Sequence, residues 1–175
     1  MKILKLLGGC FVAVLTIVSC KKEDDNINNQ LNEADKNFIL QAGISNVSEI
    51  EAAKIAVLKT TDTVVLSFAQ HMLAEHTAAH NDLKTMGGVV GFTVKDTIDA
   101  AHATTIAQLN TLTGRDFDST YIHNQLLDHQ AAINFYTDEL NNGNQLNVKA
   151  YANTILQNIR LHYQRADSIA TAFSY

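Results

Sequence analysis

The sequence predicts an all-α fold, a ferritin-like four-helix bundle, from three observations. Apolar residues recur at steps of three and four along most of the chain, the spacing of one helix face. Proline is absent from all 175 residues, and no strand-like alternation competes with the helical pattern. Glycines are expected between the helices, at their ends; beyond residue 19 they are Gly43, Gly87, Gly88, Gly91, Gly114 and Gly143.

Residues 1–19 have the features of an export signal. Lys2 and Lys5 precede an apolar run of about a dozen residues, shorter than the roughly 20 that span a bilayer. The run ends at Ser19-Cys20, which resembles the lipobox of bacterial lipoproteins. That resemblance implies cleavage after Ser19 and a lipid on Cys20, so the lipid would bind the protein to a membrane. The alternatives are an ordinary secreted protein and an uncleaved anchor.

Cysteine usage agrees with lipidation of Cys20. The other cysteine, Cys10, leaves with the signal, so the mature chain has one thiol and no disulfide framework. Residues 21–25 (Lys-Lys-Glu-Asp-Asp) resemble the surface-export tag of Bacteroidetes lipoproteins, and a solvated tether explains them equally well. We therefore expect a disordered tether over 20–32, a bundle over 33–175, and an outer-membrane location, either periplasmic or surface-exposed.

The charge of the chain argues against nucleic acid as a partner. Without residues 1–19 the chain keeps 11 basic residues and all 18 acidic ones, a net charge of −7. No basic patch or aromatic-interleaved basic stretch is present.

Helix boundaries follow from capping patterns. Asn46-Val-Ser-Glu49 has the form of a capping box. Asp62, Asp96, Asp116 and Asn147 stand where N-caps are expected. These signals predict a short N-terminal helix near 33–42, followed by helices near 47–60, 63–86, 97–113, 116–142 and 147–172.

The long connection between two predicted hairpins decides the topology. Residues 87–115 join the hairpin 47–86 to the hairpin 116–172 and carry a helix of about 17 residues, roughly 25 Å long. That is long enough to return the chain to the end from which the helix 63–86 started. The sequence therefore predicts a ferritin-like crossover containing an extra helix, with an up-down bundle as the alternative.

Three histidines stand on the apolar stripes, where leucine would be ordinary. His76, His129 and His162 each lie near the middle of a predicted helix, so their side chains are expected to meet in the core. Neutral imidazoles are good ligands for Zn, Fe, Cu or Ni, and bundle cores commonly hold such sites. Glu49 or His80 could complete the set. The carboxylates of Glu75 and Asp128 should point aside and orient histidines on other helices.

A purely structural role explains the same histidines equally well. Buried imidazoles can hydrogen-bond to Glu49, Tyr121, Gln125 or one another and fix the packing of the helices. His71, His102 and His123 lie off the stripes and are expected at the surface. Nothing identifies a catalytic residue: the chain lacks a glycine-rich phosphate loop and the Glu-x-x-His pairs of di-iron proteins.

Several segments together resemble one bacterial family. They are the acid–histidine pair Glu75-His76, the segment 112–121 (Leu-Thr-Gly-Arg-Asp-Phe-Asp-Ser-Thr-Tyr), Leu127-Asp-His129 and Arg160-Leu-His162. The chain is similar over residues 34–172 to the domain of unknown function numbered 4142, described as predicted outer-membrane or periplasmic proteins with ferritin-like bundles. Its recurrent polar positions correspond to Glu49, Glu75, His76, Asp118, Tyr121, His129 and His162, with Glu75 where aspartate is usual. The resemblance implies a fold and an envelope location but no activity.

These observations lead to two hypotheses of function. The first is a non-enzymatic envelope lipoprotein that binds a transition-metal ion through His76, His129 and His162, assisted by Glu49 or His80. The second is an envelope interaction module whose core histidines are structural. A ferritin-like redox enzyme is a weaker third option.

Overall fold

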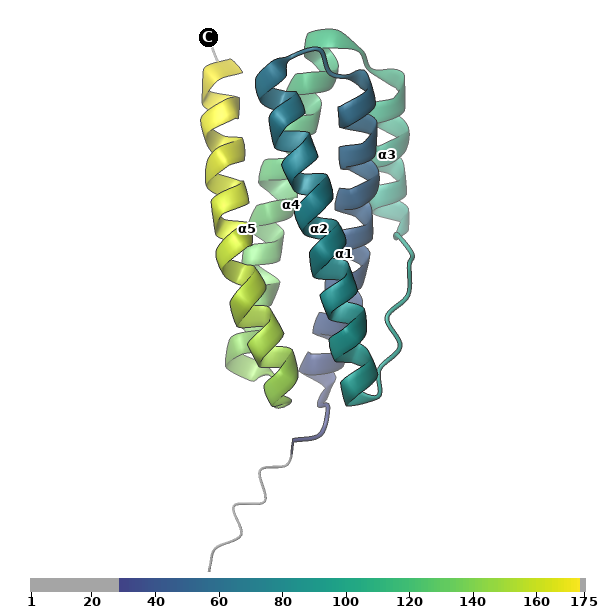
Figure 1. Ribbon diagram of the computed structural model, residues 1–175, viewed down its shortest axis with the longest axis vertical. Coiled ribbons are helices and arrows are strands. Elements are labelled where there is room, and N and C mark those ends of the chain that lie inside the picture. Colours follow the sequence, from purple (N-terminus) through teal and green to yellow (C-terminus); the bar gives the residue numbers. More distant parts are fainter. Residues whose placement is uncertain (1–28, 174–175) are drawn as a thin grey trace, which may run out of the picture.

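The computed structural model describes residues 29–173, which form five α-helices and no strand (Figure 1). The signal, Cys20 and the tether up to residue 28 lie outside the described residues. Four long helices make a bundle and a shorter one lies against its side. The predicted all-α bundle is confirmed, with helices α1 Glu33–Lys59, α2 Thr63–Val90, α3 Ala100–Thr111, α4 Gly114–Asn142 and α5 Leu146–Phe173.

The chain follows the ferritin-like path (Figure 1). Helices α1 and α2 form one antiparallel hairpin, and α4 and α5 form the other. The Asn32 side chain donates to the Asn142 carbonyl over 2.9 Å, so α1 begins where α4 ends. Lys59 Nζ donates to the Leu109 carbonyl over 3.0 Å, so α1 ends beside the end of α3. The crossover therefore runs the length of the bundle, as predicted, and α4 begins near the start of α2.

Helix α1 is continuous, and this corrects two predictions. The short N-terminal helix near 33–42 and the helix from 47 onward are one element, without a break at Gly43. Asn46 and Glu49 do not form a capping box, because both lie in the middle of α1. Their side chains are only 2% and 3% exposed, on the inward face of the helix. The amino-acid pattern of a cap is short, and a buried helix face reproduced it by chance.

The true capping box of α1 lies at residue 32. Asn32 Oδ1 accepts from the backbone N–H of Asp35 over 2.8 Å, and Asp35 Oδ2 accepts from the N–H of Asn32 over 2.7 Å. The last residues of the predicted tether are also held: the side-chain oxygen of Asn29 accepts from the N–H of Leu146 over 2.8 Å. The ordered part of the chain thus extends at least to residue 29.

The other predicted caps have mixed outcomes. Asp62 caps α2 as expected, accepting from the N–H groups of Val64 and Val65. The predictions for Asp96, Asp116 and Asn147 are wrong, because α3 is capped by Asp99, α4 begins at Gly114 and α5 begins at Leu146.

The sequence predicted that the glycines lie between the helices, and for three of them this is wrong. Gly43, Gly87 and Gly88 lie inside α1 and α2. A Cβ on Gly87 would lie 2.7 Å from the carbonyl oxygen of Phe92, so glycine lets the crossover fold back onto the end of α2. Gly91 ends α2 with φ of 75°, the left-handed cap that favours glycine.

The core consists of two apolar clusters separated by polar side chains. One cluster lies toward the α1–α2 turn and includes Phe68, Met72, Phe117, Tyr121 and Ile122. The other lies toward the opposite end and includes Phe38, Leu83, Tyr136, Tyr151 and Leu156. Burial of each such apolar side chain stabilises the fold by about 1.5–3 kcal/mol, and these contributions together hold the four helices in place.

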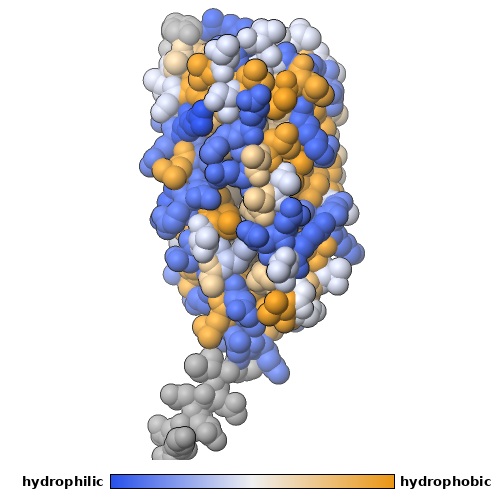
Figure 2. All heavy atoms as spheres, viewed as in Figure 1, coloured by the Kyte–Doolittle hydropathy of each residue, from blue (hydrophilic) through white to orange (hydrophobic). Residues whose placement is uncertain are grey.

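On the outside, hydrophilic and hydrophobic residues are interspersed over the face that α2 and α5 present (Figure 2). The most exposed of the large apolar side chains, Leu58, Val89 and Leu161, lie on different helices. Within residues 29–173, none of the helices combines the length and hydropathy needed to cross a membrane.

Candidate metal centre

A layer of buried polar side chains crosses the bundle between the two apolar clusters, and we call it the polar layer. Each of the four long helices contributes to it, and every member is at most 6% exposed. Burying polar groups without partners is costly, so the hydrogen bonds of this layer reveal its role. The members are Asn46 and Glu49 from α1, His76 from α2, Gln125 and His129 from α4, and His162 from α5.

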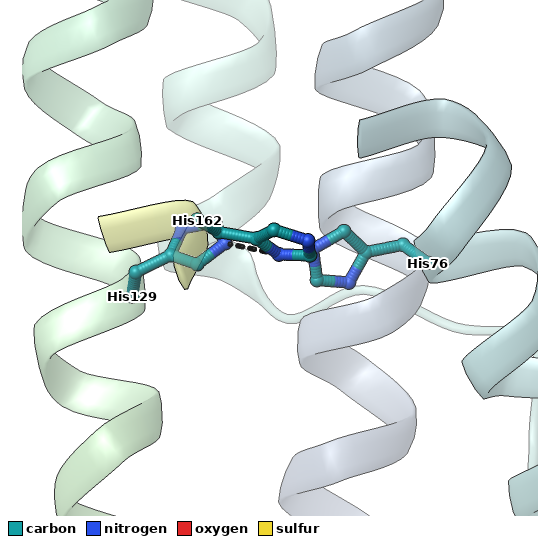
Figure 3. A group of neighbouring side chains, drawn as sticks. All are labelled: His76, His129 and His162. Atoms are coloured by element: carbon teal, nitrogen blue, oxygen red, sulfur yellow. Dashed lines mark hydrogen bonds between the residues drawn. The ribbon is translucent and has the colours of Figure 1, made fainter. Parts of the chain in front are cut away.

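The three histidines predicted to meet in the core do meet there (Figure 3). The ring centroids of His76, His129 and His162 are 5.3–5.5 Å apart in every pair. One ring nitrogen from each histidine lies within 4.8 Å of the other two. Three different helices therefore place three imidazole nitrogens around one point.

The hydrogen bonds of His76 fix which of its nitrogens carries the proton. Asn46 Nδ2 donates to the Tyr151 hydroxyl over 3.3 Å, and that hydroxyl donates to the Ala79 carbonyl over 3.1 Å. Asn46 Oδ1 is consequently the acceptor facing His76 Nδ1, 3.0 Å away. His76 is thus protonated on Nδ1, and its Nε2 lone pair faces the other histidines.

The ring of His129 is oriented in the same way, by a backbone carbonyl group. Its Nδ1 lies 2.8 Å from the Gln125 carbonyl oxygen, which can only accept, so Nδ1 carries the proton. Its Nε2 lone pair points to His162 Nδ1, 3.3 Å away.

The third imidazole, His162, is held by a carboxylate. Its Nε2 lies 3.0 Å from Glu75 Oε2. A charge-assisted hydrogen bond to a carboxylate is about twice as strong as a neutral one, so Nε2 keeps the proton and Nδ1 is left as a lone pair. The lone pairs of His129 and His162 therefore face each other.

This arrangement suits a metal ion better than it suits hydrogen bonding. Among the described residues, no donor reaches His76 Nε2. An ion bound tetrahedrally at about 2.1 Å from each nitrogen requires nitrogens about 3.4 Å apart, which the His129–His162 pair already matches. The other separations are at most 4.8 Å, so they exceed that spacing by no more than about 1.4 Å. Each ligand nitrogen is backed by an acceptor on its opposite side, as ligating histidines usually are.

Burial also favours the neutral form of the three histidines, the form that can bind a metal ion. Desolvation, followed by the neighbouring His129 and His162, lowers the pKa of His76 well below its usual value. Desolvation lowers the pKa of His129 to about 3. Desolvation lowers the pKa of His162 as well, against the opposing effect of its hydrogen bond to the Glu75 carboxylate. A proton shared between His129 and His162 is consequently disfavoured at neutral pH.

The other two predicted ligands lie outside this group of nitrogens. Glu49 Oε1 is 3.7 Å from Nδ1 of His129, the protonated side of that ring, and Glu49 Oε2 accepts from Gln125 Nε2 over 2.5 Å. Burial raises the pKa of Glu49 to about 8, which favours its neutral form. His80 faces the crossover, where its Nε2 lies 2.6 Å from Asp96 Oδ1. The sequence placed Glu49 and His80 beside His76 from their positions along the helices. Those positions do not determine the direction in which each side chain points.

Two residues in or beside the polar layer were not predicted to lie there. Asn46 was assigned to a cap, although its position in the series Ala42, Asn46, Glu49, Ala53 has the three- and four-residue spacing of a buried stripe. His71 was placed at the surface; it is 43% exposed, but its ring lies 5.5 Å from that of His162. The role of Glu75 in orienting a histidine on another helix was foreseen.

The comparisons with known proteins bear on family and fold. The profile of a family described as a domain of unknown function, DUF4142, matches residues 21–169. The chain belongs to the DUF4142 family. Among curated proteins, no relative matches the sequence.

A solved structure supports the fold of this DUF4142 chain. The crystal structure of a DUF305 fragment from Deinococcus radiodurans has a TM-score of 0.73 at 15% identity, covering 82% of this chain and 99% of the fragment. Identity at that level supports the helical architecture alone.

Two polar positions of the family resemblance lie away from the three histidines. Asp118 and Tyr121 are both buried on α4, and Tyr121 belongs to the apolar cluster near the α1–α2 turn. The Tyr121 ring stacks on Phe117 with a 7° interplanar angle, and burial raises its pKa well above 10. These residues support packing beside the polar layer and do not belong to the group of three histidines.

Proposed function

We propose that this DUF4142 protein is a cell-envelope lipoprotein that binds one transition-metal ion through His76 Nε2, His129 Nε2 and His162 Nδ1. The observation that carries the metal proposal is the convergence of three lone pairs whose opposite ring nitrogens all donate to fixed acceptors. Three imidazoles suit Zn, Cu, Ni or Fe, and leave a fourth position for water or another ligand.

The competing function is an interaction module with structural histidines. In that case a protonated His162 would donate to both Glu75 and His129 and satisfy both contacts. Burial, which lowers the pKa of His162, opposes that protonated form. A structural role would also leave His76 Nε2 without a donor among the described residues. Metal binding accounts for all three nitrogens at once.

Direct metal analysis tests the proposal. The soluble form for this work is residues 20–175 with Cys20→Ser, which contains all five helices and lacks a competing thiol. We expect one equivalent of a transition metal after purification or reconstitution, and a tetrahedral Co²⁺ absorption band that saturates at one equivalent. A protein that takes up no metal, and gives no such band, would retain only a structural role for its histidines.

The envelope location rests on the Ser19-Cys20 pair at the end of the apolar run, which resembles a lipobox. The lipid is the proposed membrane partner, and the outer membrane is the proposed site. Cys20→Ala should move the protein from the membrane fraction to the soluble fraction. A Cys20→Ala protein that stays with the membranes would exclude lipid anchoring at that position.

A further inference from the structure

A second group of potential ligands lies outside the polar layer and shares His162 with it. Its members are Nε2 of His71, the carboxylate of Glu75 and Nε2 of His162, whose ligand atoms all lie within 4.8 Å of one another. His71 and Glu75 are one turn apart on α2, and His71 Nε2 is 3.4 Å from Glu75 Oε1. The side chain of His71 is 43% exposed and that of Glu75 is 35% exposed, so solvent reaches this group.

A cleft connects two members of this outer group, Glu75 and His162, with the core histidine His76. It has a volume of about 170 Å³, lies between α2 and α5, and is lined by Glu75, His76, Ile159 and His162 among others. On the opposite side, between α1 and α4, the space beside Asn46 and His129 is only about 10 Å³. That is near the minimum needed to hold one water molecule. The α2–α5 side is therefore the open approach to the centre.

The structure assigns His71, Glu75 and the outward Nε2 of His162 to an outer metal site, through which a transition-metal ion passes to the three-histidine centre. This inference rests on the proposed function, because it supplies the route to the same centre. Two imidazoles and a carboxylate are ligands that Zn and similar ions accept, and the carboxylate adds attraction for a cation in the cleft.

The shared ring explains how the ion can be handed inward. While the outer site holds the ion on Nε2 of His162, the ring proton moves to Nδ1, where Nε2 of His129 accepts it over 3.3 Å. When the ion moves to Nδ1, the proton returns to Nε2, where Glu75 accepts it over 3.0 Å. The His162 ring gains and loses no proton overall. Each tautomer has a partner already in place.

Loading kinetics of the soluble form test this route. Stopped-flow mixing with Co²⁺ would follow the tetrahedral band of the core site in wild type, His71→Ala and His123→Ala. His123 is an exposed histidine on α4 and serves as the matched control. We expect His71→Ala to load about tenfold more slowly, with a final affinity within about twofold of wild type, because the outer site loses its most exposed ligand while the three core nitrogens are unchanged. His123→Ala should load at the wild-type rate.

A second measurement examines the outer site when the core is disabled. In His76→Gln, Zn²⁺ should still shift the ring NMR signals of His71 and His162, and His71→Ala in the same background should abolish the shift of the His162 signals. Wild-type loading kinetics in His71→Ala, or a His71 ring that ignores Zn²⁺ in the His76→Gln protein, would overturn the outer site. Failure of the proposed function looks different: wild type would then give no tetrahedral band at any time.

Discussion

The Asp35 carboxylate at one end of the bundle and the three histidines at its middle are equally buried, but their polar atoms are paired differently. Asp35 accepts three backbone N–H groups, from Asn32, Asn144 and Gln145, at 2.7–3.0 Å. The histidines satisfy only their outward nitrogens and turn three lone pairs toward one another. Asp35 therefore has its hydrogen-bonding capacity filled by the fold itself, whereas the three inward nitrogens of the histidines are left for the proposed metal ion.

The largest expected effect is on folding, at the Asp35 end. Asp35→Ala should lower the free energy of unfolding by about 3–5 kcal/mol, because it leaves three N–H groups without their charged acceptor. The loss should be the same with chelator and with metal, as measured by urea denaturation. Glu33→Ala is the matched control, since Glu33 lies in the same turn but is 90% exposed, and it should cost under about 0.5 kcal/mol. A metal-dependent loss in Asp35→Ala would break the comparison.

The pH dependence of stability should come in part from Glu139, beside Asp35. Burial, followed by the charge of Asp35, raises the pKa of Glu139 from 4.5 to about 8. The folded protein thus holds this proton more tightly than the unfolded chain. The free energy of unfolding should be highest below pH 4.5 for this group and fall as the pH rises to about 8. Glu139→Gln should flatten that fall in urea titrations, and an unchanged slope would show that Glu139 ionises freely.

A smaller effect, on metal affinity, is expected at Asn46. Asn46→Ala removes the acceptor that holds His76 Nδ1, so metal affinity should fall about 10–100-fold. The measurement is competition for Zn²⁺ against a chelator of known affinity. Asn37→Ala, an exposed asparagine on the same helix, should leave the affinity unchanged. Equal affinities for Asn46→Ala and wild type would mean that the orientation of His76 does not matter.

The fold was predictable because it follows from periodicity. The stripes of α2, α4 and α5, the Asp62 cap and the length of the crossover led to the observed bundle. The predicted break inside α1 is wrong because Asn46 and Glu49 are polar residues on a buried face of one continuous helix. Polar residues at this spacing have the same local pattern as a helix cap.

The sequence correctly predicted the level of the three histidines along the bundle, but it did not predict the direction in which every candidate side chain points. Helical spacing placed His76, His129 and His162 at one level, which the structure bears out. It could not distinguish His76 from His80, one turn away and equally buried at 6% exposure, because the crossover that attracts His80 through Asp96 has no periodic pattern. The tautomers, too, depend on long-range partners such as Glu75 for His162.

His76 and His80 also provide the most direct test of the metal centre. The measurement is the melting temperature of the soluble form as wild type, His76→Gln and His80→Gln, each with chelator and with excess Zn²⁺. An ion at about 1,000 times its dissociation constant adds about 4 kcal/mol, a rise of about 10 °C for a domain of this size. We expect that rise in wild type and His80→Gln and its loss in His76→Gln. A wild-type melting temperature that is indifferent to Zn²⁺, Cu²⁺, Ni²⁺ and Fe²⁺ would contradict the metal centre, all the more if His76→Gln destabilised the metal-free protein strongly.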